Sequence, residues 1–179
     1  MTQSSTVHPD LSGPGEPVLA AHGVVKSFPG VLAVDRVDFD LRAGEVHSLL
    51  GENGAGKSTL ASVLCGAYLP DAGSVSVRGR AVELRTPRDG LDHGIAMVHQ
   101  HFRLVERFTV SENVILGDDR LPRWLTHDRI DDEVARVADE FGLPVDPRAR
   151  IHDLAVGQRQ RVEIVKALYR GADLLILDE

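Results

Sequence analysis

The sequence predicts an α/β protein, and three features of the chain support that prediction. Short apolar runs of strand type, separated by Gly, Pro and Asp, dominate residues 18–85, and helical patterns follow in the second half. A glycine-rich loop joins one of the apolar runs directly to the first helical pattern. The final strand-type segment, DLLILD at residues 173–178, is typical of a strand buried on both faces of a parallel sheet.

Length and composition allow one domain, or part of one. The chain has 179 residues, of which 42% are apolar and 26% are charged, values that are ordinary for soluble globular proteins. The formal charge of −7 argues against nucleic-acid binding through a broad basic face, because that mode depends on many Lys and Arg contacts. We therefore expect no nucleic-acid partner, and any phosphate site should be small and local.

Cysteine usage and hydropathy favour a protein that is cytosolic, or that lies on a membrane only through a partner. The single cysteine, Cys65, suits a reducing compartment and predicts a buried, unreactive thiol. No apolar run approaches the roughly 20 residues that span a bilayer, and the N-terminus lacks the apolar core of a signal peptide. Residues 1–17, rich in Ser, Thr, Pro and Gly, are predicted to form a flexible tail.

The first half of the chain is expected to contain strands interrupted by one helix. The strand-type runs are residues 18–25, 37–41, 46–50 and 74–79. The helix should begin near Lys57, with a buried stripe formed by Leu60, Val63, Leu64 and Ala67.

The second half is expected to be mainly helical. After a strand at residues 95–99, Thr109 and Glu112 have the spacing of a capping box at a helix start. The next helix ends before Gly142, and a third spans residues 158–170. The apolar stripe of the middle helix consists of Val134, Val137, Ala138 and Phe141.

The glycine-rich loop, GENGAGKS at residues 51–58, fits a phosphate-binding pattern and lies between a predicted strand and a predicted helix. Its glycines let successive backbone N–H groups turn toward phosphate oxygens, and the helix N-terminus adds positive potential. Lys57 can reach the outer phosphates, and the Ser58 hydroxyl can bind Mg²⁺. The sequence therefore predicts a nucleotide phosphate site at this loop.

Two carboxylates, Asp178 and Glu179, follow the last apolar run. In enzymes with such a loop, an Asp at the end of an apolar strand helps to hold the Mg²⁺ of the nucleotide. Glu179 could orient or deprotonate an attacking water. A terminal Asp-Glu pair is usually a solvated end, but four preceding strand-type residues favour the functional interpretation here.

Gly157 and Gln158 stand before the third helix, in the stretch LAVGQ. This loop could offer N–H groups to a second anion, or it could be a plain glycine turn before a helix. Spacing alone leaves both alternatives open.

Together these motifs resemble those of the ATP-binding subunits of ABC transporters. GENGAGKST resembles the Walker A motif of that family, LAVGQ its LSGGQ signature and LLILDE its Walker B motif with the catalytic Glu, in the same order. Gln100 falls at the Q-loop position, and Phe28 at the aromatic residue that stacks on adenine. The resemblance implies a P-loop NTPase with a RecA-like core, an antiparallel β subdomain and an α-helical subdomain at about residues 101–160.

The resemblance also implies the ligands and the residues that bind them. ATP and Mg²⁺ are the expected cofactors, and Gln100 and Glu179 are the expected catalytic residues. Ser58, Gln100 and Asp178 are expected to hold the metal ion. The expected nucleotide contacts are Phe28, Gly51, Asn53, Gly54, Gly56, Lys57, Ser58, Thr59, Gly157 and Gln158.

The amino-acid sequences of FPGVLAVD and of residues 97–117 most resemble those of the subfamily that imports simple sugars and nucleosides. The implied partners are permease membrane subunits, a second nucleotide-binding domain in tandem or as a separate chain, and, indirectly, a solute-binding protein. The implied location is the cytoplasmic face of the cell membrane, as a peripheral protein. Ala155 and Val156 replace the usual signature Ser and Gly, so we expect weaker contact with the second domain.

In this family a D-loop and a switch His follow Walker B. Residues 18–179 are therefore expected to be a partial nucleotide-binding domain that is incomplete at the C-terminus. Such a partial domain should be inactive alone. The strand after Walker B normally lies between the Walker A and Walker B strands, and its absence should leave main-chain groups unpaired in the sheet. The expected function is ATP hydrolysis that drives solute import. The alternatives are a nucleotide-binding module without turnover and a soluble ABC ATPase outside transport.

Overall fold

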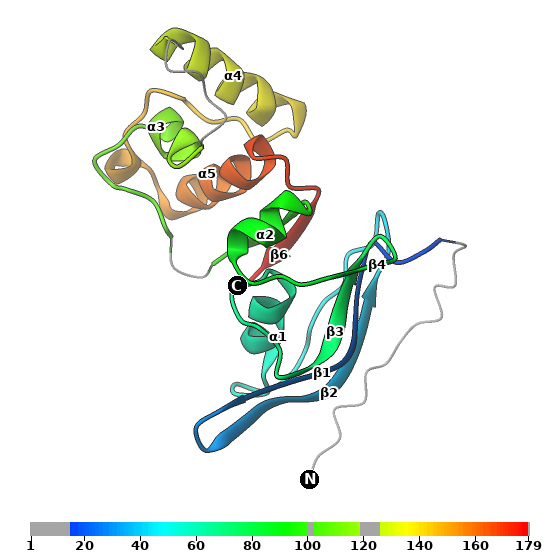
Figure 1. The fold of residues 1–179 in the computed structure, drawn as a ribbon. Helices are drawn as coiled ribbons and strands as arrows, with labels where there is room; N and C mark the ends of the chain where they lie inside the picture. The colour runs from blue at the N-terminus through cyan, green and yellow to red at the C-terminus, as the bar shows by residue number, and fades with distance from the viewer. Residues whose placement is uncertain (1–14, 100–101, 119–125, 179) are drawn as a thin grey trace. The chain divides into compact units, whose positions relative to one another are not determined.

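A computed structural model describes residues 15–99, 102–118 and 126–178, and it confirms the α/β prediction (Figure 1). The chain divides into two compact units, with the boundary after Gly90. A short helix, α2 (Pro87–Asp92), crosses that boundary. The greater part of the predicted tail, residues 1–14, lies outside the described residues, so its flexibility remains a prediction.

An antiparallel sheet of four strands, in the order β2-β1-β3-β4, dominates the first unit. Its two long strands are β1 (Leu19–Phe28) and β2 (Val31–Leu41), and its two shorter strands are β3 (Ala72–Val77) and β4 (Arg80–Val82). β1 pairs with both β2 and β3, and its N-terminal half is the most buried part of the sheet.

Helix α1 (Lys57–Leu64) begins where the sequence predicts. Leu60, Val63 and Leu64 are buried as expected, but the helix ends before Ala67, which is exposed. The prediction that Ala67 completes the buried stripe was therefore wrong. Cys65 directly follows the helix and is only 3% exposed, so the prediction of a buried thiol is confirmed.

The predicted strand at residues 46–50 is not a strand in the structure. Val46 and Leu50 are 93% and 85% exposed, although both are apolar. A strand needs a neighbour for its N–H and C=O groups, and neither sheet of the described chain pairs with this segment. An apolar run before the glycine loop was thus insufficient evidence for a strand.

In the second unit, β5 (Ile95–Val98) and β6 (Leu174–Leu177) form a parallel pair. Both strands were predicted. The expected burial of the final strand on both faces was wrong, because Leu177 is 60% exposed and two other residues of the strand are only partly buried.

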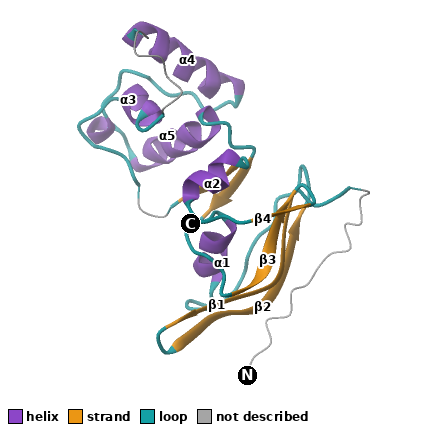
Figure 2. Cartoon of the chain, in the orientation of Figure 1, coloured by secondary structure: helices purple, strands orange, loops and turns teal. Residues whose placement is uncertain are grey.

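Helices α3 (Val110–Ile115), α4 (His127–Glu140) and α5 (Val156–Tyr169), with the 3₁₀ turn Ile151–Asp153, make up the remainder of this unit (Figure 2). α5 begins two residues before its predicted start. Phe141 is 51% exposed and lies beyond α4, so it does not extend the buried stripe. The core shared by these elements consists of Val110, Val114, Ile130, Val134, Ala138, Ile151, Val162 and Val165.

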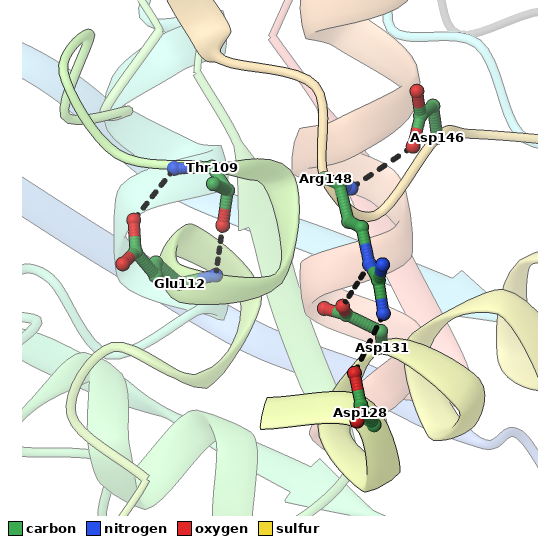
Figure 3. Close-up of polar contacts among 6 residues, drawn as sticks. All are labelled: Thr109, Glu112, Asp128, Asp131, Asp146 and Arg148. Carbon is green, nitrogen blue, oxygen red and sulfur yellow. Dashed lines mark hydrogen bonds and ion pairs between the residues drawn. The ribbon is translucent and has the colours of Figure 1, made fainter. Parts of the chain in front are cut away.

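Polar side chains stabilise the first turns of α3 and α4. The predicted capping box is present: the Glu112 N–H donates to the Thr109 hydroxyl, and the Glu112 carboxylate accepts from the Thr109 N–H (Figure 3). Arg148 forms ion pairs of 2.6 and 2.8 Å with Asp128 and Asp131 in the first turns of α4 (Figure 3).

Among the described residues, no helix is long and apolar enough to cross a membrane.

Candidate functional site

The loop at residues 51–58 has the backbone that a phosphate-binding loop requires. Gly54 and Gly56 both have φ of 84°, a region that residues with a side chain rarely adopt. A Cβ atom on residue 56 would also lie 2.1 Å from the main-chain oxygen of Ala33 in β2. Glycine is thus needed at position 56 for two independent reasons.

Lys57 folds back over this loop. Its Nζ donates hydrogen bonds to the carbonyl oxygens of Gly51, at 2.7 Å, and Glu52, at 2.9 Å. The ammonium group therefore lies over the loop at the partly exposed start of α1, where backbone N–H groups have no partner within the helix. The predicted residues that this short segment brings together are Gly51, Asn53, Gly54, Gly56, Lys57, Ser58 and Thr59.

Phe28 ends β1 and faces Val31 across the turn to β2. Because Ala33 of β2 contacts Gly56, this hairpin lies beside the loop. The Phe28 ring is 38% exposed and touches Tyr68, with the ring centroids 5.4 Å apart. Tyr68 was missed at the sequence level, where nothing distinguishes it from an ordinary aromatic residue after a helix.

Asp178 directly follows β6 in the second unit, and its N–H donates to the Val98 carbonyl oxygen at 3.0 Å. Its carboxyl group therefore lies at the carboxyl end of the parallel strand pair, near His99. Burial and the nearby Arg103 lower the pKa of His99, while Glu163 and Asp178 act to raise it.

Both predicted catalytic residues, Gln100 and Glu179, lie outside the described residues. Their roles remain predictions.

The signature stretch forms the exposed start of α5. Ala155 is the N-cap residue, and its N–H donates to the side-chain oxygen of Gln158 at 2.9 Å. Alanine has no side-chain oxygen, so the reciprocal bond of a capping box cannot form. Val156 is 71% exposed, and an added Cβ at Gly157 would meet nothing within 4 Å.

Two buried polar side chains that the sequence analysis missed hold the segment after the Q-loop position. Glu163 of α5, 9% exposed, accepts from the Arg103 N–H at 2.6 Å. Asn113 of α3, fully buried, accepts from the Val105 N–H and donates to the carbonyl oxygens of Val105 and Thr109. An Asn in the polar stretch SEN gives no sequence signal of such burial.

Comparison with known proteins gives a consistent result. Residues 34–179 match the ABC transporter family. The guanosine import ATP-binding protein NupO of Bacillus subtilis is 48% identical over 166 residues, which cover 92% of this chain and 32% of that protein. The ribose import ATP-binding protein RbsA 1 of Rubrobacter xylanophilus is also 48% identical, with 91% and 33% covered. The chain thus spans about a third of the length of these curated relatives.

Solved structures show the same fold. A nucleotide-free ATP-binding cassette from an ABC transporter has a TM-score of 0.79 at 24% identity, over 92% of this chain and 69% of that one. The ADP conformation of MJ1267, an ATP-binding cassette of an ABC transporter, has a TM-score of 0.77 at 25% identity, with the same coverage. The predicted P-loop NTPase fold of a nucleotide-binding cassette is confirmed.

Proposed function

Since the chain belongs to the ABC transporter family, we propose that it binds ATP and, in its full-length protein, hydrolyses it to drive import of a sugar or nucleoside through a membrane permease. The observation that carries the proposal is the loop at residues 51–58, where Gly56 has the required backbone and Lys57 lies over the loop. The relatives support the solute class, because NupO is named for the import of guanosine, a nucleoside, and RbsA 1 for the import of ribose, a sugar.

Within this proposal, the residues of the loop bind the triphosphate. Lys57 carries a fixed positive charge toward the outer phosphates, and the backbone of Gly51–Thr59 offers N–H donors. Phe28, at the hairpin beside the loop, stacks on adenine.

The donor set also fits Mg²⁺, which prefers oxygen ligands and is usually held by one or two protein groups together with phosphates. By resemblance to the family, Ser58 and Asp178 would supply a hydroxyl and a carboxylate of that type, and Gln100 would supply a third oxygen. When bound, the ion neutralises charge on the phosphates. Glu179 and Gln100 orient and activate the attacking water.

We further propose that Gly157 and Gln158 contact ATP held by a second nucleotide-binding domain, in tandem or on another chain. The exposed start of α5 supports this role. Ala155 offers no hydroxyl, so backbone N–H groups supply the contact. The permease subunits place the protein at the cytoplasmic face of the membrane as a peripheral subunit, and a solute-binding protein acts indirectly through them.

Uptake by cells tests this proposal. A strain that depends on the full-length protein is given labelled ribose or guanosine, and uptake is compared between the natural protein and Lys57→Ala. We expect Lys57→Ala to abolish uptake of one solute class, and Arg136→Ala, which removes an exposed positive charge from α4, to leave it unchanged. Equal uptake with Lys57→Ala would contradict an ATP-driven import role.

A further inference from the structure

We infer that Tyr68 is a positioning residue for the Phe28 ring, so that the two aromatic side chains form one preformed platform for the base of the nucleotide. The inference rests on the proposed ATP site, and it adds a residue that the family motifs do not include. It is carried by contacts within the first unit.

The two rings meet edge to face. Their centroids are 5.4 Å apart and their planes are inclined by 74°, within the range that aromatic pairs prefer. Phe28 is 38% and Tyr68 is 44% exposed, so neither ring is held in place by burial in the core. The orientation of the Phe28 ring therefore depends on its few neighbours, of which Tyr68 is one.

The loop that carries Tyr68 is fixed at both ends. Before the loop, the N–H groups of Ala67 and Tyr68 both donate to the carbonyl oxygen of Ser62 in α1. After it, the Asp71 carboxylate accepts from the Ser27 N–H and hydroxyl, each at 2.7 Å, and the Asp71 N–H donates to the Val25 carbonyl oxygen. These bonds fasten the loop to β1 immediately before Phe28.

Lys26 completes the cluster. Its Nζ lies 2.8 Å from the Asp71 carboxylate and 5.8 Å from the centroid of the Phe28 ring. In the sheet, Lys26 pairs with Val34, the residue next to Ala33, which contacts Gly56 of the phosphate loop. A base held at Phe28 would thus lie on the hairpin that borders the phosphate loop, which is the arrangement that a nucleotide needs.

Binding of two ligands to the full-length protein separates base recognition from phosphate binding. Dissociation constants are measured by calorimetry for ATP and for inorganic tripolyphosphate, which lacks a base. We expect Tyr68→Leu to weaken ATP binding by roughly two- to tenfold, as expected for loss of one aromatic pair, and to leave tripolyphosphate binding unchanged. Tyr68→Phe keeps the ring and should match the natural protein with both ligands.

Two results for Tyr68→Leu would overturn the inference: no change in ATP binding, or an equal loss for both ligands, which would show a general disturbance of the loop. Equal affinity of the natural protein for ATP and tripolyphosphate would also overturn it, because no base would then be recognised. If the natural protein binds neither ligand, the proposed ATP site itself fails, and that result is distinct from the other three.

Discussion

Gly56 lies so close to Ala33 that a Cβ atom on residue 56 would be 2.1 Å from the Ala33 carbonyl oxygen. The contact joins the last glycine of the phosphate loop to the main chain of β2. A side chain at position 56 must therefore displace either the loop or the strand.

Gly56→Ala is expected to lower the free energy of unfolding by about 2–5 kcal/mol, because a positive φ and a main-chain clash both oppose the added methyl group. Urea denaturation provides the measurement. Gly30→Ala is the matched control, since Gly30 has φ of 80° and open space around it, and it should lose only about 1–2 kcal/mol. Equal losses for the two variants would show that the contact with Ala33 is unimportant.

Ala155→Ser should stabilise the protein. Ala155 has the extended backbone of an N-cap residue, with φ of −64° and ψ of 157°, so a Ser hydroxyl could accept from the Gln158 N–H. The expected gain in the free energy of unfolding is about 1 kcal/mol, measured by urea denaturation. Ala155→Val, which adds bulk but no acceptor, should give no gain; a similar gain from Val would rule out capping as the cause.

Asn113→Ala should be strongly destabilising although it removes no apolar packing. The side chain satisfies the N–H and C=O of Val105 from a fully buried position, and each group left unpaired costs about 1–3 kcal/mol. We expect a loss of at least about 2 kcal/mol. Asp139→Ala, at an exposed position of α4, should change stability by less than about 0.5 kcal/mol, and a comparable loss in both variants would refute the assignment.

Asp71 should contribute to the pH dependence of stability. Hydrogen bonds from Lys26 and Ser27 hold the pKa of this carboxyl well below its usual range. A carboxyl with a depressed pKa stabilises the folded state above its unfolded pKa of about 3.9, and this contribution is lost as the pH falls toward the folded pKa. Between about pH 5 and 2, Asp71→Asn should therefore flatten the fall in stability. Parallel curves for the natural protein and Asp71→Asn would contradict this.

Local signals predicted the local structure well. The start of α1 at Lys57 and the capping box of Thr109 and Glu112 depend on residues within one turn, and both are confirmed. The glycines and Lys57 of the loop at residues 51–58 also act within eight residues, and the structure shows the positive φ of Gly54 and Gly56 and the Lys57 hydrogen bond to the loop, while phosphate binding itself stays a prediction.

Features that depend on distant partners could not be predicted. Val46 and Leu50 have strand-type side chains, but a strand also requires a neighbour, which hydropathy does not reveal. Asn113 is buried because its amide matches the main chain of Val105, and Tyr68 matters because a loop 40 residues after Phe28 returns to it. Such pairings exist only in the folded chain.

The most direct test of the proposed nucleotide site is ATP binding to the full-length protein, measured by calorimetry for the natural protein and for Lys57→Ala. Hydrogen bonds from a charged group to phosphate contribute enough that the substitution should weaken ATP binding by roughly tenfold or more, while Arg136→Ala on α4 should bind as the natural protein does. Unchanged ATP affinity in Lys57→Ala, or no ATP binding by the natural protein, would contradict the claim that the loop at residues 51–58 is a nucleotide phosphate site.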